Sequence, residues 1–239
     1  MLDTTGLLSC RIRVQETDLH ILADRDVAER AEELVFQYRL QIENYIIKHR
    51  LFSATLAPME EDVFAPQLVR SMMRAGITAG VGPMAAVAGT IAEAVGQDLI
   101  GEGAREIIIE NGGDIFLQRS KVCRAAIYAG RSPLSNRVGI ELCPDQMPMG
   151  LCTSSGTVGH SLSLGEADSV TVLARSTPLA DAAATRLGNE VGKGQRRQQR
   201  LEQALEAAKT IDDLMGVVII CDDLIGAVGD IELVRLGGN

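Results

Sequence analysis

Apolar and polar residues alternate with two different periods in the first fifty positions. Residues 10–14 alternate as a strand does, and residues 19–22 are placed to pair with them as a hairpin. From about residue 24 to residue 49 the apolar positions recur every three to four residues instead. The pattern predicts a strand hairpin and then a long amphipathic helix, whose apolar face carries Leu34, Tyr38, Ile42 and Tyr45.

The middle of the chain is rich in small residues. Residues 76–92 carry no charge, and Pro83 is placed as the first-turn proline of a helix over residues 84–95. The stretch is almost long enough to span a bilayer, but its Gly and Ala content favours a buried helix and no membrane partner. The helix would be thin enough for another backbone or a ligand to approach closely at Ala85, Ala86, Ala88, Gly89 and Ala92.

Short apolar runs separated by turn residues continue to the C-terminus. Two more helices are expected, one over residues 179–189 that Thr177 and Pro178 open, and one over residues 201–215. Strands in hairpin order with helices between them predict an α+β fold of mostly antiparallel sheets, in a single domain over residues 1–239. The strands are expected at residues 106–110, 115–117, 124–128, 138–142, 170–174, 216–221 and 231–236.

Charge and cysteine usage exclude some classes of partner. The 239 residues include 23 Lys and Arg against 32 Asp and Glu, a net charge of −9, which argues against a nucleic-acid partner. An anionic ligand stays open, because backbone amides and a metal hold phosphate without basic side chains. The five cysteines form no CxxC pair, which favours free thiols and a cytoplasmic location. The Ala-rich helices predict the interface of a homodimer.

Hydroxyl and imidazole groups gather in residues 152–160. The turn from Thr153 to Thr157, with Ser154, Ser155 and Gly156 between them, offers hydroxyls and amides that can cradle phosphate, although the same residues also make ordinary polar turns. His160 is a candidate general base, a hydrogen-bond donor to phosphate, or a structural histidine. Ser155 with His160 would suit a hydrolase, but the G-x-S-x-G elbow of that class is absent.

Asp181 and Thr185 lie one helical turn apart in the helix that follows. Together with a backbone carbonyl they would present three oxygens to a hard cation such as Mg²⁺, which keeps its other positions for water or phosphate. The alternative is that Asp181 complements the helix dipole near its N-terminus and that Thr185 only packs.

Two glycine-rich segments are candidate ligand loops. The turn of Asn111, Gly112, Gly113 and Asp114 is either only a hairpin turn or a place where missing side chains admit a nucleotide. Residues 80–83 precede the thin helix and could cradle phosphate at its N-terminus. They match neither a Walker A motif nor GxGxxG.

In this order, these segments resemble the ApbE superfamily, whose best-known members are FAD:protein FMN transferases. The match covers roughly residues 76–192, and it is closer still to an uncharacterised branch of ApbE-related proteins. That branch carries the segments at residues 81–89, 110–115 and 152–161 much as they stand here. The motifs that carry the resemblance are Ala88-Gly89, Asn111-Gly112-Gly113-Asp114, Ser155-Gly156-Thr157, His160, Ser169-Val170-Thr171-Val172 and the segment from Ala180 to Thr185.

The resemblance implies a Mg²⁺ ion held by Asp181, Thr185 and the carbonyl near Ala85, beside the diphosphate of FAD or a related nucleotide. It implies that His160 lies near the transferred phosphate or assists the hydroxyl of a protein acceptor. Ligand contacts are then expected at Gly82, Ala88, Asn111, Gly112, Gly113, Asp114, Thr153, Ser154, Gly156 and Thr157.

Gly82 and Ala88 are small where the transferases usually carry an acidic residue and a Lys or Glu. The leading hypothesis is a Mg²⁺-assisted pocket for a nucleotide or another phosphorylated ligand, with flavin transfer as its reaction. A non-catalytic binding or scaffold protein of the same fold is the alternative, and a Ser/His hydrolase is the third.

Overall fold

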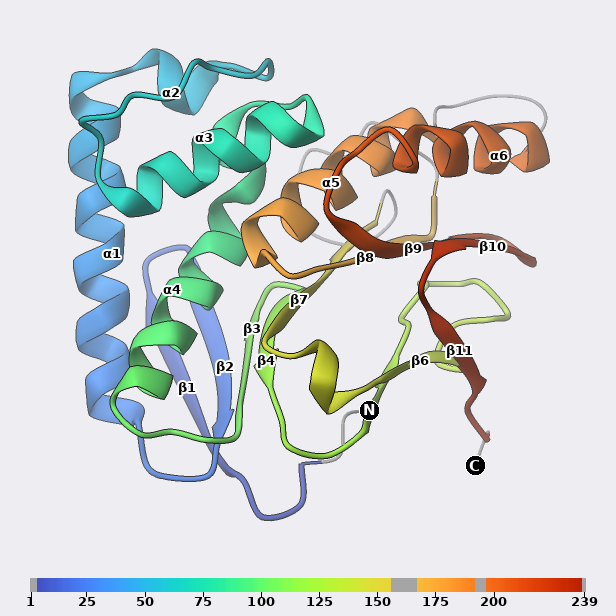
Figure 1. Ribbon diagram of the computed structural model, residues 1–239, viewed down its shortest axis with the longest axis horizontal. Helices are drawn as coiled ribbons and strands as arrows, with labels where there is room; N and C mark the ends of the chain where they lie inside the picture. The colour runs from blue at the N-terminus through green and yellow to red at the C-terminus, as the bar shows by residue number, and fades with distance from the viewer. Residues whose placement is uncertain (1–3, 156–166, 192–196, 238–239) are drawn as a thin grey trace.

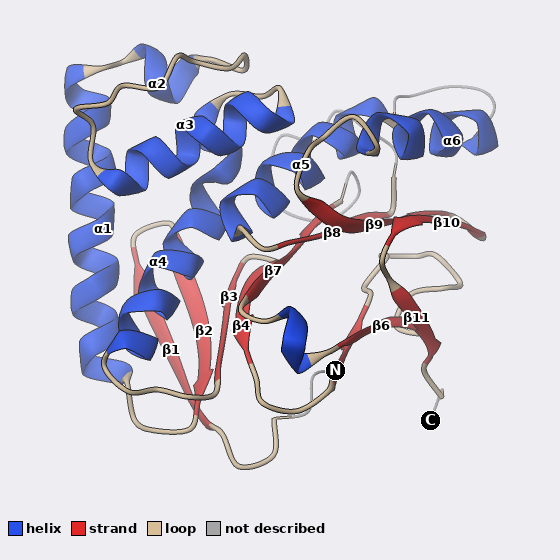
Figure 2. Cartoon of the chain, viewed as in Figure 1, coloured by secondary structure: helices blue, strands red, loops and turns tan. Residues whose placement is uncertain are grey.

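The computed structural model describes residues 4–155, 167–191 and 197–237, and it has three layers (Figure 1). Helices cover one face of an eight-stranded sheet, and a three-stranded sheet packs on part of the other face. Figure 2 shows the α-helices gathered on one side of the strands. One apolar core lies under the helices, and a second lies between the two sheets.

The large sheet is built entirely from antiparallel neighbours in the order β1-β2-β3-β4-β7-β8-β9-β10. This confirms the predicted α+β fold with mostly antiparallel sheets. The hairpin at the start of the chain is confirmed too, with Ile12 opposite Leu19. The strands are β1 (Leu8–Val14), β2 (Thr17–Ala23), β3 (Ile107–Asn111), β4 (Asp114–Gln118), β7 (Met149–Ser154), β8 (Ser169–Ala174), β9 (Leu214–Cys221) and β10 (Leu224–Gly229).

The small sheet has the order β11-β6-β5, formed by Glu232–Arg235, Val138–Leu142 and Cys123–Ala126. Its inner face, with Ile140 and Leu142 fully buried, packs on Leu117 and Leu173 of the large sheet. Alternate residues of β7 and β8 therefore point to opposite cores. This alternation decides which candidate residues face the helices.

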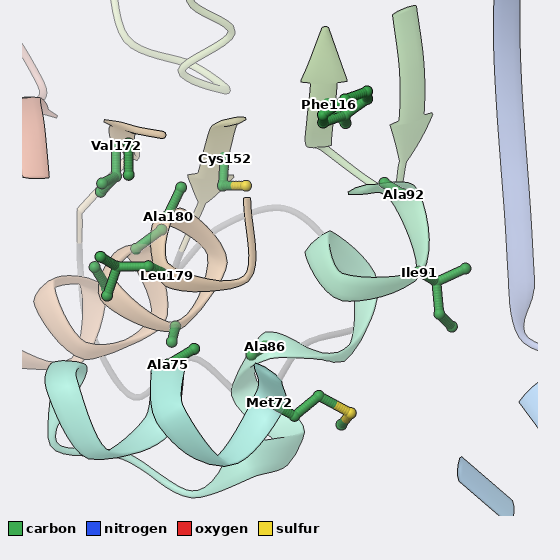
Figure 3. Packing of buried hydrophobic residues seen from close by; sticks show 14 of the residues in the cluster. Met72, Ala75, Ala86, Ile91, Ala92, Phe116, Cys152, Val172, Leu179 and Ala180 are labelled. Carbon is green, nitrogen blue, oxygen red and sulfur yellow. The ribbon is translucent and has the colours of Figure 1, made fainter. Parts of the chain in front are cut away.

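The first helix is α1 (Ala28–Lys48), which lies where the apolar period predicted a helix. It buries Leu34, Ile42 and Tyr45. Helix α4 contacts both β3 and β4 through its small residues, and a Cβ atom on Gly96 would lie 2.2 Å from Phe116 Cδ1. Figure 3 shows this kind of packing, with Ala92 of α4 facing Phe116 and Ala180 beside Cys152. The others are α2 (Leu51–Ala54), α3 (Gln67–Ala79), the 3₁₀ turn η1 (Pro83–Ala86), α4 (Val87–Gly101), the 3₁₀ turn η2 (Pro144–Gln146), α5 (Thr177–Glu190) and α6 (Arg197–Ala208).

Several element boundaries differ from the sequence-based expectation. Helix α5 takes Ser176 as its N-cap, whose hydroxyl accepts from Leu179 N at 3.4 Å, so the predicted cap at Thr177 was wrong by one residue. Helix α6 ends at Ala208 and not at residue 215, because β9 starts at Leu214 to pair with β8. Strands β7 and β10 and the short helix α2 were not predicted at all.

Over the described ranges, no helix is by itself long and apolar enough to cross a membrane. Helix α3 and the segment Pro83–Gly101 meet the length and composition criterion only as a pair, bent by 106° at the break between them. The Ala-rich α4 and α5 lie mostly buried within this chain, with Ala92, Ala180 and Ala183 at zero exposure. They therefore offer little surface for the homodimer contact that their composition suggested.

Candidate functional site

The N-terminus of α4 meets α5 at a single buried carboxylate. Gly89 N donates a hydrogen bond to Asp181 Oδ2 at 2.8 Å, across 92 residues of sequence. Helix α4 has no side-chain cap from its own preceding residues, so Asp181 satisfies one of its unpaired amides from the neighbouring helix. The acid interacts with the dipole of α4, not with that of its own helix as the simpler interpretation of the sequence had it.

Gly89 allows the two helices to come this close. A Cβ atom at this position would lie 2.7 Å from the Thr177 carbonyl oxygen and 2.9 Å from Asp181 Cβ. A second tie forms one turn later, where Thr177 N donates to Glu93 Oε2 at 2.6 Å. Glu93 is half-buried, and burial raises the pKa of its carboxyl.

The β3–β4 turn reaches the same helix end. Gly112 and Gly113 both have positive φ, +67° and +109°, so the tight turn itself accounts for both glycines. Beside them, Asn111 Nδ2 donates to the Ala88 carbonyl oxygen at 3.1 Å and ties the turn to α4. The segments around Ala88 and Asn111, far apart in sequence, are therefore in contact.

Asp114 adds a second carboxylate next to Asp181. It pairs with Cys152 across β4 and β7 and makes a hydrogen bond with the Cys152 thiol. Burial raises the pKa of Asp114 to about 7, with a further contribution from Glu110. Burial, and then the charge of Asp114, also raise the pKa of Asp181 well above its usual range, while the Gly89 amide opposes the rise. Two carboxylates that disfavour each other's charge would both be stabilised by a cation between them.

Two hollows open beside this cluster and share Glu16 and Asn111 in their linings. The first has a volume of about 470 Å³ and is mainly apolar, with Ile42, Ile46, Met84, Val87, Ala88 and Ile91 in its wall. The second has a volume of about 710 Å³ and is lined by polar and charged groups, including Arg11, Asp18, His20, Glu110 and Gly112. Asp181 and Thr185 lie outside both linings, and Asp181 is joined to the wall of the apolar hollow by its hydrogen bond from Gly89, the residue after Ala88.

The three residues expected to hold a metal lie on adjoining elements. Thr185 is half-buried one turn after Asp181 on α5, and α5 contacts the 3₁₀ turn that contains Ala85. In the described part of the chain, no group of three or more His, Cys, Asp or Glu side chains is placed to hold a metal. Besides the Asp181 carboxylate, a cation here would therefore need hydroxyl and carbonyl oxygens as ligands, and Mg²⁺ binds such oxygens.

Gly82 serves the packing of the chain. Its N donates to the Leu56 carbonyl oxygen at 2.8 Å, and a Cβ atom would lie 2.1 Å from the Thr55 carbonyl oxygen. Contact with residues 55–56 is sufficient to explain why this position is small.

The expected phosphate turn at residues 153–157 begins as part of a strand. Thr153 Oγ1 lies 3.1 Å from Thr171 Oγ1 on the side of the small sheet, so it points away from Asp181. Ser154 alternates to the helix side, and Ser155 follows the end of β7. Gly156, Thr157 and His160 lie outside the described residues.

Three contributors to this cluster were not assigned a role from the sequence. Cys152 was expected to be a free thiol and Gly89 to be part of the Ala88-Gly89 motif, but neither was expected to contact a site carboxylate. Glu93 carried a usable signal, since it is the only charged residue between Arg74 and Asp98.

A family model described as AbpE bacteria matches residues 1–233. The chain belongs to this family. Its relatives include a UPF0280 protein of Methanocaldococcus jannaschii, 42% identical over 229 residues that cover 94% of this chain and 92% of the relative. A UPF0280 protein of Methanosarcina acetivorans is 40% identical over 220 residues, covering 92% and 85% of the two chains.

Solved structures confirm the fold of this AbpE-family chain. The apo flavinyl transferase ApbE of Pseudomonas stutzeri matches with a TM-score of 0.56 at 14% identity, over 93% of this chain and 94% of that one. A mutant of the flavin transferase ApbE of Vibrio cholerae matches with a TM-score of 0.60 at 13% identity, over 93% and 96%. The family model, together with this shared fold, confirms the resemblance to ApbE proteins that the motifs indicated.

Proposed function

We propose that this AbpE-family protein binds FAD or a related nucleotide together with Mg²⁺, and that flavin transfer is its reaction. One observation carries the proposal: the buried Asp181 carboxylate binds the Ala88–Gly89 end of α4, and Ala88 and Asn111 at that helix end line the two hollows. The flavin transferases with the same fold support the choice of ligand.

The residues around Asp181 fit a hard cation. Its carboxylate, the Thr185 hydroxyl and the Ala85 carbonyl would supply oxygens only, as Mg²⁺ prefers. The neighbouring Asp114 raises the electrostatic cost of a charged Asp181, and a cation would relieve that cost. When bound, the ion would neutralise the diphosphate of the nucleotide.

The two hollows suit different parts of the ligand. The apolar hollow suits a ring system, and the polar hollow suits ribose, ribityl or phosphate groups; both volumes lie in the usual range for ligand sites. Gly112 is exposed at the rim and presents no side chain, so a ligand can approach its backbone. Asn111 positions this turn through its bond to Ala88.

Calorimetric titration of FAD, with and without Mg²⁺, tests the binding step. We expect the affinity to fall at least tenfold when Mg²⁺ is removed with EDTA. The Asp181→Asn variant should lose this dependence, because its amide oxygen can still accept from Gly89 N while its charge is gone. Asp212→Asn, at an exposed turn residue, is the matched control and should behave as the wild type. An FAD affinity that changes neither on removal of Mg²⁺ nor in the Asp181→Asn variant would contradict the proposal.

The transfer step has a separate readout. Flavin transfer from FAD releases AMP and leaves FMN attached to a hydroxyl of the acceptor protein. The wild type or the Asp181→Asn variant can be expressed in a host cell and the host proteins separated on a denaturing gel. Flavin fluorescence that stays with a protein band shows covalent flavin, and we expect it with the wild type but not with the variant. Mg²⁺-dependent FAD binding with neither AMP nor covalent flavin would instead establish the binding-protein alternative.

A further inference from the structure

The outer face of α1 carries large apolar side chains that nothing in the described chain covers. Phe36, Leu40 and Ile47 are 61%, 46% and 72% exposed, and their spacing places them in one line along the helix. Leu51, at the start of α2, is 65% exposed and extends this line of apolar side chains beyond the C-terminal end of α1. In Figure 1, α1 forms the left edge of the molecule, with α3 and α4 on its inner side. We call Phe36, Leu40, Ile47 and Leu51 the α1 stripe.

Charges at the two ends of α1 have opposite sign. Glu29, Glu32 and Glu33 are exposed near the N-terminal end, where Arg30 pairs with Glu33 at 3.0 Å and a net negative charge remains, whereas Lys48 and Arg50 are exposed at the C-terminal end. The single acid between Phe36 and Ile47 is Glu43, and its charge is already paired with Arg39 at 2.9 Å. The helix therefore presents an apolar centre between an acidic end and a basic end.

Such a helix is complementary to itself when a second copy lies antiparallel to it. With a two-fold axis passing between residues 41 and 42, Phe36 lies opposite the partner's Ile47, and Glu33 lies opposite the partner's Arg50. A two-fold interface requires this kind of self-complementary patch. A partner with charge of only one sign would meet repulsion at one end of α1.

We propose that the α1 stripe is the contact surface for a second copy of this chain, with the two α1 helices antiparallel. This dimer does not depend on the function proposed above. It does bear on the site, because Arg39, Glu43 and Ile46 on the flank of α1 line the apolar hollow. The second copy therefore lies at the rim of that hollow.

Sedimentation velocity of the full chain over a range of concentrations tests the proposal. The wild type should sediment as a dimer at high concentration, and Ile47→Asp should sediment as a monomer. Val122→Asp is the matched control, because Val122 is also half-exposed but belongs to the small-sheet side of the molecule, and it should leave the dimer intact. Unchanged melting temperatures would show that both variants are folded.

Charge reversal tests the antiparallel arrangement itself. Glu33→Lys and Arg50→Glu should each raise the dimer dissociation constant by about tenfold, since each reversal turns two attractions into two repulsions. The double variant restores opposite charges across the two-fold axis and should return to near the wild-type constant. A monomeric wild type at all concentrations would overturn the proposal, as would a dimer that survives Ile47→Asp or a double variant weaker than either single one.

Discussion

Replacing Gly89 with alanine puts the close approach of α4 and α5 to a direct test. The new Cβ would lie 2.7 Å from the Thr177 carbonyl oxygen and 2.9 Å from Asp181 Cβ. Both neighbours belong to the first turns of α5, and the nearer one is backbone, so neither can rotate away. The helices must separate, and the hydrogen bond from Gly89 N to Asp181 Oδ2 lengthens or breaks.

The magnitude follows from these two effects. Overpacking of a well-packed core costs about 1–3 kcal/mol. Loss of a hydrogen bond to a buried carboxylate costs about 1.5–3 kcal/mol. The effects overlap, so we expect Gly89→Ala to lower the free energy of unfolding by about 3 kcal/mol, or roughly 6–12 °C in melting temperature for a chain of this size.

Urea denaturation followed by circular dichroism measures this change, with Gly101→Ala as the matched control. Gly101 ends the same helix, and a Cβ atom there would meet nothing within 4 Å. The control should be unchanged or up to about 1 kcal/mol more stable, because alanine restricts the unfolded chain. A Gly89→Ala protein within about 0.5 kcal/mol of the wild type would refute the contact on which the site depends.

Two further predictions concern the β3–β4 turn and the carboxylate beside it. Because burial raises the pKa of Asp114 to about 7, the folded state keeps a proton that the unfolded chain releases above about pH 4. In EDTA, the free energy of unfolding should therefore fall as the pH rises from about 4 to about 7, and Asp114→Asn should reduce this slope in urea titrations, leaving the part that belongs to Asp181, whose pKa burial also raises; an equal slope would exclude the assignment. At the turn, Gly113→Ala should cost about 1–2 kcal/mol because its φ is +109°, whereas Gly112→Asn, at +67°, should be nearly neutral. Equal costs in the same denaturation assay would contradict the turn geometry.

Local periodicity was sufficient for the elements whose burial follows their own sequence pattern. The β1–β2 hairpin, helix α1 and strand β6 lie where alternation or the helical period predicts them. Strand β7 was missed because Met149–Ser154 does not alternate and ends in hydroxyl residues that are typical of turns. Its strand conformation comes from pairing with β4 and β8, which are distant in sequence.

The candidate site was predictable in part for the same reason. The ordered motifs indicated that Ala88, Asn111 and Asp181 belong together, and the structure brings these three segments into contact. The direction in which Asp181 points could not be predicted, because it caps a helix 92 residues away and has no local signal. Thr153 was expected to face the ligand because its strand, and with it the alternation of faces, was not recognised.

We propose that Asp181 holds a cation beside a nucleotide. The most direct test of this proposal is a crystal structure of the protein with FAD and Mn²⁺, in which the anomalous scattering of Mn²⁺ locates the ion. We predict an anomalous peak within about 2.0–2.3 Å of an Asp181 carboxylate oxygen, with the diphosphate of FAD as a further ligand. An FAD molecule bound in the hollows with no peak at Asp181, or with its metal held elsewhere, would contradict the account.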